Sequence, residues 1–275
     1  MVARSGTHRY LVELGYDGSG FAGWARQPGR RTVEGELRSA VVRLGLAASE
    51  EEAGIAIASR TDRGVNARGN AMTISSRLGP QELLRALHGV SEDIFFSRIA
   101  TVPEEFRVRS ALERRYRYWE RPGSEVPALW KEAAALFRGT VDVRSFGRGL
   151  GTAGPVWRDF HSLGASSEAD WVIVDLRAPS FVWGMVRKII SALRQLETGR
   201  LTVDRLASAL RGERTISLPL AEPERLVLWE VSYPVPWTHH AAVRSRRTDP
   251  FHSLVVAAAA RKEILARIRP GTSAP

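Results

Sequence analysis

The sequence predicts an α+β protein made of two tandem units that repeat one order of elements: strand, helix, strand, strand, helix, strand. Short apolar runs mark the strands, and longer runs with helical periodicity mark the helices. With 275 residues, the chain is long enough for two domains of ordinary size. This element order is that of the ferredoxin-like, split β-α-β unit. We therefore expect a mixed, mainly antiparallel sheet with a central cleft between the halves.

The first unit is predicted over residues 1–103. Its first helix follows the capping residue Thr32, and Glu34 and Glu36 suit the positive end of the helix dipole. Its second helix opens on Pro80, a residue favoured at the first helical position. The expected strands cover residues 9–15, 54–58, 71–75 and 94–102, and the expected helices cover residues 32–46 and 80–88.

The second unit is predicted over residues 104–237 and repeats the element order of the first. Its expected strands cover residues 111–120, 156–165, 171–178 and 226–233, and its expected helices cover residues 127–137, 181–197 and 202–211. A linker rich in proline and tryptophan follows at residues 234–237. Residues 238–275 are predicted as a basic helical tail, with a basic cluster at residues 244–247 and a helical pattern at residues 253–268.

Composition limits the classes of function. Hydrophobic residues make up 44% of the chain and charged residues 25%, which is typical of a globular protein. The net charge of +10 favours an anionic partner, nucleic acid first. The chain has no cysteine, which excludes disulfides, thiolate zinc sites and cysteine nucleophiles and fits a reducing compartment. No signal peptide or membrane-spanning run is recognisable, so we expect a cytoplasmic protein without a membrane partner.

Two glycine patterns have the form G-x-G-x-x-G, at residues 18–23 and 149–154. A dinucleotide site needs a helix to begin at such a motif, so that the helix N-terminus can hold the pyrophosphate. Pro28 and Gly29 interrupt the first candidate helix, and Pro155 follows the second pattern at once. Both stretches are therefore expected to be loops, and no nucleotide cofactor is expected. The histidines show no metal-ligand spacing, and no metal is expected either.

The stretch at residues 59–67 is the strongest candidate for chemistry. The apolar run at residues 54–58 leads into Asp62, with Arg60 and Arg63 on either side. Nearby positive charge favours the ionised form of an aspartate, and the same charge suits a polyanionic substrate. The competing interpretation is an ordinary Asx-type turn in Thr-Asp-x-Gly, and this stretch taken alone favours it.

Three further stretches have a structural and a functional interpretation. The loop that begins at Tyr16 holds Phe21 and Trp24, which suit either a packed core or stacking on single-stranded RNA, where Arg26 would contact phosphates. Residues 114–118 alternate, with Tyr116 and Tyr118 on one face and Arg115 and Arg117 on the other. For Tyr118 we favour a structural role. Arg187 lies in an apolar helix and needs an acidic partner.

Five motifs follow one another at residues 16–27, 32–37, 60–65, 114–118 and 181–187. In this order they resemble the TruA-type tRNA pseudouridine synthases, and the resemblance extends from about residue 10 to residue 233. It implies the pseudouridine synthase fold, a tRNA substrate, a homodimer, and neither cofactor nor metal. It also implies isomerisation of uridine to pseudouridine in the anticodon stem-loop, at tRNA positions 38, 39 and 40.

The resemblance also implies roles for particular residues. Asp62 initiates the reaction, Arg187 pairs with it, and Tyr116 stacks on the target uracil. Further substrate contacts are expected from residues in or beside the motifs: Arg60, Leu226, Tyr16, Arg26 and Arg63. Arg60 is the residue that would occupy or hold the space left by an extruded base.

The chain departs from the family pattern at several positions. Ser59 stands where the family has glycine, Arg63 where it has alanine, Asn66 where it has histidine, Ala25 where it has glutamine, and Arg225 where it has glycine. The alternative function is a catalytically inactive RNA-binding protein of the same fold. Another base-flipping enzyme, such as a glycosylase, is a weaker alternative and would release free base.

Overall fold

The structure of the protein is a computed structural model, which describes residues 6–122, 125–150, 154–168 and 171–239. The expected basic cluster at residues 244–247 and the expected helix at residues 253–268 lie outside the described residues. The strands are β1 (His8–Tyr16), β2 (Ala56–Ile57), β3 (Asn66–Ser76), β4 (Ile94–Val102), β5 (Glu113–Pro122), β6 (Gly139–Asp142), β7 (Trp157–Phe160), β8 (Ser162–Glu168), β9 (Trp171–Ala178), β10 (Leu226–Ser232) and β11 (Thr238–His239). The helices are α1 (Val33–Arg43), α2 (Glu50–Ala53), α3 (Pro80–Leu87), α4 (Ala128–Leu136), α5 (Met185–Glu197) and α6 (Val203–Leu210), with short 3₁₀ turns η1 (Gly18–Gly20) and η2 (Pro223–Arg225).

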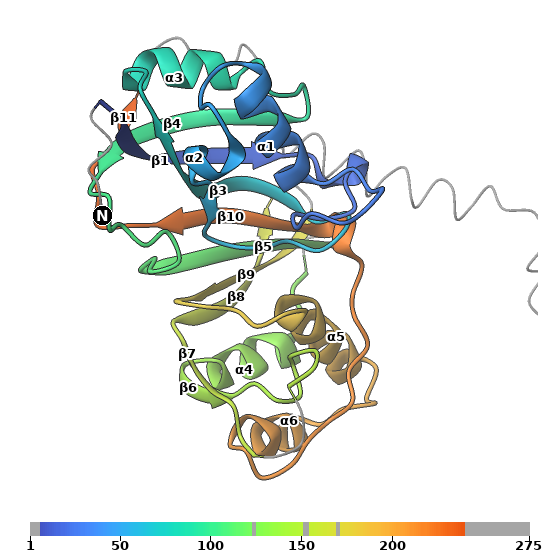
Figure 1. The fold of residues 1–275 in the computed structure, drawn as a ribbon. Coiled ribbons are helices and arrows are strands. Elements are labelled where there is room, and N and C mark those ends of the chain that lie inside the picture. The colour runs from blue at the N-terminus through green and yellow to red at the C-terminus, as the bar shows by residue number, and fades with distance from the viewer. Residues whose placement is uncertain (1–5, 123–124, 151–153, 169–170, 240–275) are drawn as a thin grey trace, which may run out of the picture.

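One large sheet connects the two halves of the protein (Figure 1). Among the described residues its strand order is β11-β4-β1-β3-β10-β5-β9-β8, with β2 paired to β3. Within each half, the last strand lies beside the first, followed by the third and then the second: β4-β1-β3-β2 and β10-β5-β9-β8. Both halves therefore have the ferredoxin-like strand order, and the expected α+β fold class is confirmed.

The strand β10 joins the halves. It pairs antiparallel with β5 of its own unit and parallel with β3 of the first unit, where Val227 lies opposite Asn66. The other strand pairs that the structure describes are antiparallel. The sheet is thus mixed and mainly antiparallel, as the sequence predicts.

The residues predicted to start the two helices of the first unit do so. The hydroxyl of Thr32 accepts a hydrogen bond from the amide of Gly35 at 3.2 Å and caps α1, whose Leu37 and Val41 are fully buried. Pro80 is the first residue of α3, where its missing N–H costs no helical hydrogen bond. These caps place both helices of the first unit within a few residues of the expected bounds.

The segment before the candidate site differs from the prediction. The expected strand at residues 54–58 is only the short β2, because α2 precedes it and has Gly54 as its C-cap. Gly54 has a φ of 56°, a left-handed conformation that glycine adopts without steric cost. The strand expected at residues 71–75 is longer and begins at Asn66, so the loop that carries Asp62 is shorter than expected.

Two elements of the second unit also differ. The helix expected from residue 181 begins at Met185, because Gly184 has a φ of 79° and residues 181–183 stay outside the helix. The strand expected at residues 156–165 is interrupted at His161. Its first part, β7, pairs with β6, a strand that the sequence does not predict, and its second part, β8, pairs with β9.

The expected linker at residues 234–237 leads back to the first unit. It ends in β11, where Thr238 lies opposite Ile99 of β4. Beside this pair, the Arg98 guanidinium lies 4.9 Å from the ring centroid of Trp237. The first residues of the expected tail are therefore part of the sheet.

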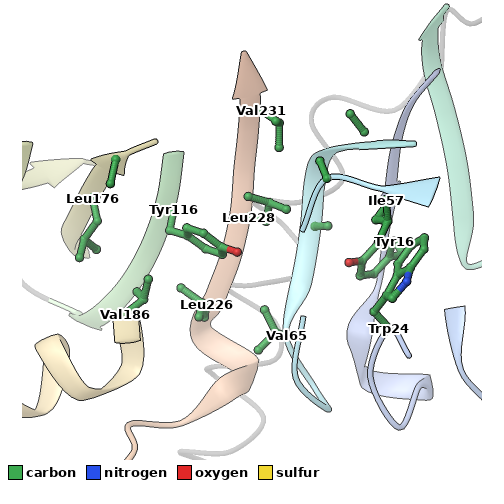
Figure 2. Close-up of a cluster of buried hydrophobic side chains, with 14 of the residues drawn as sticks. Tyr16, Trp24, Ile57, Val65, Tyr116, Leu176, Val186, Leu226, Leu228 and Val231 are labelled. Atoms are coloured by element: carbon green, nitrogen blue, oxygen red, sulfur yellow. The ribbon is translucent and has the colours of Figure 1, made fainter. Parts of the chain in front are cut away.

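A single buried cluster extends across β10 from one unit to the other (Figure 2). Tyr116 of β5 lies beside Leu226 and Leu228 of β10, and Val65 packs from the first unit. Because this core is continuous, the loop before β3 and the start of α5 are held at fixed positions relative to each other.

Candidate active site

Asp62 lies in the loop between β2 and β3. The amide of Val65 donates to the carbonyl of Asp62 at 3.2 Å and closes a turn, in which Gly64 has a φ of 80°. The amide of Trp24 donates to the carbonyl of Thr61 at 3.1 Å. The loop is thereby fixed on both sides of Asp62, whose side chain is 24% exposed.

Buried side chains support this loop from the core. The hydroxyl groups of Tyr16 and Thr61 are hydrogen-bonded at 2.8 Å. The amide of Asn70 donates to the carbonyl of Ser59 at 2.8 Å and to the Tyr16 hydroxyl at 3.3 Å. Tyr16 is completely buried, so a substrate does not reach it. Its position supports Thr61 and does not fit the substrate contact that the resemblance implies.

Arg114 is a supporting residue to which sequence reasoning gave no role. Its buried guanidinium donates to the hydroxyl of Ser59 at 2.9 Å and to the carbonyls of Ala58 at 3.1 Å and Arg109 at 2.9 Å, and it also contacts the carbonyl of Pro179. The alternation along residues 114–118 places Arg114 on the same face as Tyr116. Its position on this face could have predicted that Arg114 is buried and supports the loop, because a buried arginine requires several acceptors.

Asn66 replaces the histidine of the family pattern, and its amide joins three segments. Its oxygen accepts from the amide of Gly18 at 2.8 Å, and its nitrogen donates to the carbonyl of Glu224 at 3.0 Å. A neutral imidazole has one donor and one acceptor in the same way, but the asparagine amide is shorter. Asn66 therefore links the first loop, the Asp62 loop and the turn before β10.

Arg187 forms the ion pair with Asp62 that the resemblance implies. It lies in the first turn of α5, and its Nη1 is 2.9 Å from Oδ2 of Asp62. Its Nε donates to the carbonyl of Ala221 at 2.6 Å, which orients the guanidinium. Both partners are mostly buried, with exposed side-chain fractions of 14% for Arg187 and 24% for Asp62, so solvent screens the pair only partly.

The second carboxylate oxygen of Asp62 contacts a residue that the sequence did not single out. The indole N–H of Trp183 donates to Oδ1 at 2.6 Å. The guanidinium of Arg148 lies 4.2 Å from the ring centroid of Trp183. The four-residue spacing between Trp183 and Arg187 could have predicted this contact, because it places both hydrogen-bond donors near the start of the same helix.

Tyr116 lines the same site from β5 and is 7% exposed. Its ring packs edge-on against Phe181, with centroids 4.9 Å apart. Burial raises the pKa of Tyr116 to about 12, and the Asp62 carboxylate contributes in the same direction. The phenol is therefore neutral at physiological pH and keeps its proton as a hydrogen-bond donor.

These side chains surround a cleft of about 1110 Å³ between the two units, as expected. Asp62, Tyr116, Arg187 and Leu226 all line it. Its volume is sufficient for one extruded nucleotide with part of the flanking backbone. Four exposed arginine side chains also contribute to its lining: Arg60, Arg63, Arg109 and Arg148.

Arg26 does not line this cleft, although its neighbours Ala25 and Gln27 do. It lines a separate groove of about 460 Å³ with Arg30, Arg31 and Arg43. Its guanidinium forms a salt bridge with Glu50 at 2.6 Å. The structure therefore does not bring Arg26 together with Asp62.

Within the described residues, no group of three or more histidine or acidic side chains is arranged to hold a metal ion. Among the same residues, no helix is long and apolar enough to cross a membrane.

The duplicated ferredoxin-like sheet, with a paired aspartate and a buried tyrosine in its central cleft, agrees with the pseudouridine synthase fold. A family model described as tRNA pseudouridine synthase matches residues 133–234. The tRNA pseudouridine synthase A of Thermococcus onnurineus is 36% identical over 228 residues, which cover 82% of this chain and 85% of that protein. The corresponding protein of Thermococcus kodakarensis is 36% identical over 230 residues, with the same coverage. The chain belongs to the tRNA pseudouridine synthase family, whose members are isomerases.

A solved structure, titled crystal structure of a Cbf5-Nop10-Gar1 complex, is similar over 78% of this chain and 56% of the matched chain. It is 10% identical, with a TM-score of 0.34, which is too low to add to the argument about the fold.

Proposed function

We propose that this protein converts uridine to pseudouridine in tRNA and that Asp62 initiates the reaction. The reaction breaks the bond between N1 and C1′, turns the base, and rejoins it through C5. The observation that carries the proposal is the position of Asp62: its carboxylate lines the cleft and is held by Arg187 at one oxygen and by Trp183 at the other. A structural Asx turn needs none of these contacts.

We also propose a role for each of the other expected site residues that line the cleft. Arg187 keeps the carboxylate oriented. Tyr116 offers an aromatic ring and a neutral hydroxyl to the target base. Leu226 forms an apolar wall beside it. The target nucleotide must leave its stack to reach Asp62. Arg60 is exposed and lines the cleft, which supports the proposal that it fills or holds the vacated space.

Charge supports an RNA substrate. The net charge is +10, and exposed arginines line the cleft, where their guanidinium groups suit phosphate oxygens. Arg63 belongs to this set. Arg26 is proposed as a backbone contact outside the cleft, and Tyr16 as a support for Thr61, so neither is assigned to the target base.

The catalytically inactive alternative is not favoured, because RNA binding alone does not require an oriented carboxylate inside a cleft. The finer proposals rest on the family resemblance. They are action in the anticodon stem-loop at positions 38, 39 and 40 and a homodimer. A cytoplasmic location is a further proposal, which does not rest on the resemblance. Site-resolved mapping of pseudouridine on tRNA tests the first, and light scattering at micromolar concentration tests the second.

Asp62→Asn tests the central assignment. The variant keeps the shape but loses the charge and, because an amide has a single acceptor oxygen, one of the two bonds that Arg187 and Trp183 donate. It should still fold, bind tRNA with nearly normal affinity, and release no detectable tritium from C5-labelled uridine. Asp93→Asn is the matched control, because Asp93 also pairs with an arginine, Arg31, but lies outside the cleft. Normal turnover by Asp62→Asn would refute the assignment, and release of free uracil by the wild type would indicate a glycosylase.

A further inference from the structure

Trp183 contacts Asp62, but the roles proposed above assign it no part in the reaction. It is 57% exposed, although burial of an indole ring is favourable. Gly184 is the N-cap of α5 and has a left-handed conformation, so Trp183 lies outside the helix, where it lines the cleft. Something other than core packing therefore accounts for its position.

The indole N–H contacts the carboxylate oxygen that Arg187 leaves open. Trp183 donates to Oδ1 at 2.6 Å, and Arg187 donates to Oδ2 at 2.9 Å. A carboxylate held at a single oxygen can still rotate about its Cβ–Cγ bond. Donors on both oxygens fix its plane, and hydrogen bonds to an ionised acceptor are the stronger ones.

Arg148 holds the indole in place. Its guanidinium lies 4.2 Å from the centroid of the Trp183 ring, which is a cation–π distance. Its backbone amide also donates to the carbonyl of Trp183 at 2.9 Å. The first contact limits the rotation of the exposed indole, and the second fixes the backbone that carries it, so the N–H stays directed at Asp62.

We propose that Trp183 is a positioning residue, which fixes the plane of the Asp62 carboxylate together with Arg187. The proposal rests on the assignment of Asp62 as the group that initiates the reaction. Its contribution is to the rate of the chemical step, because an oriented carboxylate is already in its reactive geometry when the nucleotide arrives. The competing role is a stacking surface for RNA, which would act on affinity.

Two substitutions separate these roles. Trp183→Phe keeps an aromatic face but removes the donor, and we expect kcat to fall about tenfold or more while KM for tRNA changes less than about threefold. Trp183→Gln removes the aromatic face but keeps an N–H donor, because its amide nitrogen is as many bonds from Cα as the indole nitrogen. It should restore much of the lost kcat. A stacking role predicts the reverse order of the two variants.

Trp157→Phe is the matched control, since Trp157 is 46% exposed, lies on β7 and does not line the cleft. It should have wild-type kcat and KM. Wild-type kcat in Trp183→Phe, or a higher KM with unchanged kcat, would overturn the proposal. If Asp62→Asn is inactive while Trp183→Phe is normal, only the positioning role fails. If Asp62→Asn remains active, the assignment of Asp62 itself fails.

Discussion

The guanidinium of Arg114 donates from Nε to the hydroxyl of Ser59 at 2.9 Å, and both residues are buried. Ser59 stands where the family pattern has glycine. A glycine offers no side-chain acceptor, so the serine gives Arg114 an additional bond to the loop that carries Asp62. The departure from the pattern therefore connects the second unit to the loop on which the proposed chemistry depends.

Ser59→Ala tests this connection. The substitution leaves a buried donor of Arg114 without its acceptor, and the free energy of unfolding should fall by about 1–3 kcal/mol. Urea unfolding at neutral pH measures it. Ser39→Ala on the exposed face of α1 is the control and should be at least as stable as the wild type, since alanine is the better helix former. An unchanged unfolding midpoint in Ser59→Ala would show that the bond contributes nothing.

Arg187→Ala should reduce single-turnover rates by about 100-fold, because it removes a charge-assisted bond to Asp62 and leaves that carboxylate without its ion-pair partner. Arg187→Lys should be intermediate, since one ammonium replaces a guanidinium that contacts both Asp62 and Ala221. Tritium release at saturating enzyme measures both. An alanine variant as fast as the wild type would exclude a role for the ion pair.

Tyr116→Phe should bind tRNA almost normally and turn over more slowly. The phenylalanine keeps the ring beside Phe181 and removes the hydroxyl alone. Because burial raises the pKa of Tyr116 to about 12, the hydroxyl stays protonated throughout the usual assay range. The wild-type rate should therefore show no alkaline decline from this group below about pH 10. Equal losses of affinity and rate would identify Tyr116 as a structural residue.

The affinity for tRNA should fall steeply with salt, and the double variant Arg60→Gln, Arg63→Gln should reduce that dependence. Each lost phosphate contact lowers the slope of log affinity against log salt by about 0.7 for single strands and about 0.9 for duplex. Filter binding across a salt series gives the slopes. Arg211→Gln, at an exposed arginine outside the cleft, should keep the wild-type slope. The same slope in all three proteins would place the phosphate contacts elsewhere.

Stability should depend on Glu222 at acid pH. Burial alone would raise its pKa, but its hydrogen bonds and the Arg194 guanidinium lower the pKa of Glu222 to about 2. Its hydroxyl partner is Tyr118, at 3.0 Å. Since the folded-state pKa is below the ordinary value of about 4.3, the contribution is complete above that pH and is lost as the pH falls toward 2.

Glu222→Gln should therefore lower the free energy of unfolding at pH 7 by about 1 kcal/mol, a value reduced for its partial exposure. The difference from the wild type should shrink between pH 4 and pH 2. Urea unfolding at several pH values measures it. Glu197→Gln, which breaks the ion pair of Glu197 with Arg121, should differ little from the wild type. A pH-independent difference would contradict the account.

Local patterns in the sequence were sufficient for the fold class and the family. Thr32 and Pro80 mark helix starts through contacts within a few residues, and alternation along β5 assigns Tyr116 and Arg115 to opposite faces. The order of the motifs implied the pairing of Asp62 with Arg187. Such signals survive without tertiary information because caps, turns and side-chain alternation depend on neighbouring residues.

The tertiary structure decided what depends on contacts between distant residues. Nothing in the sequence of β10 indicates that it lies between β5 and β3. Strands pair through backbone N–H and C=O groups, which do not depend on the side chains and so do not specify the partner strand. The burial of Tyr16, the location of Arg26 and the bond from Trp183 to Asp62 likewise depend on contacts between residues far apart in the sequence. Tyr16 contacts Thr61, Arg26 pairs with Glu50, and Trp183 donates to Asp62. Trp183 and Asp62 are 121 residues apart, and only the packing of α5 against the Asp62 loop brings the indole to the carboxylate.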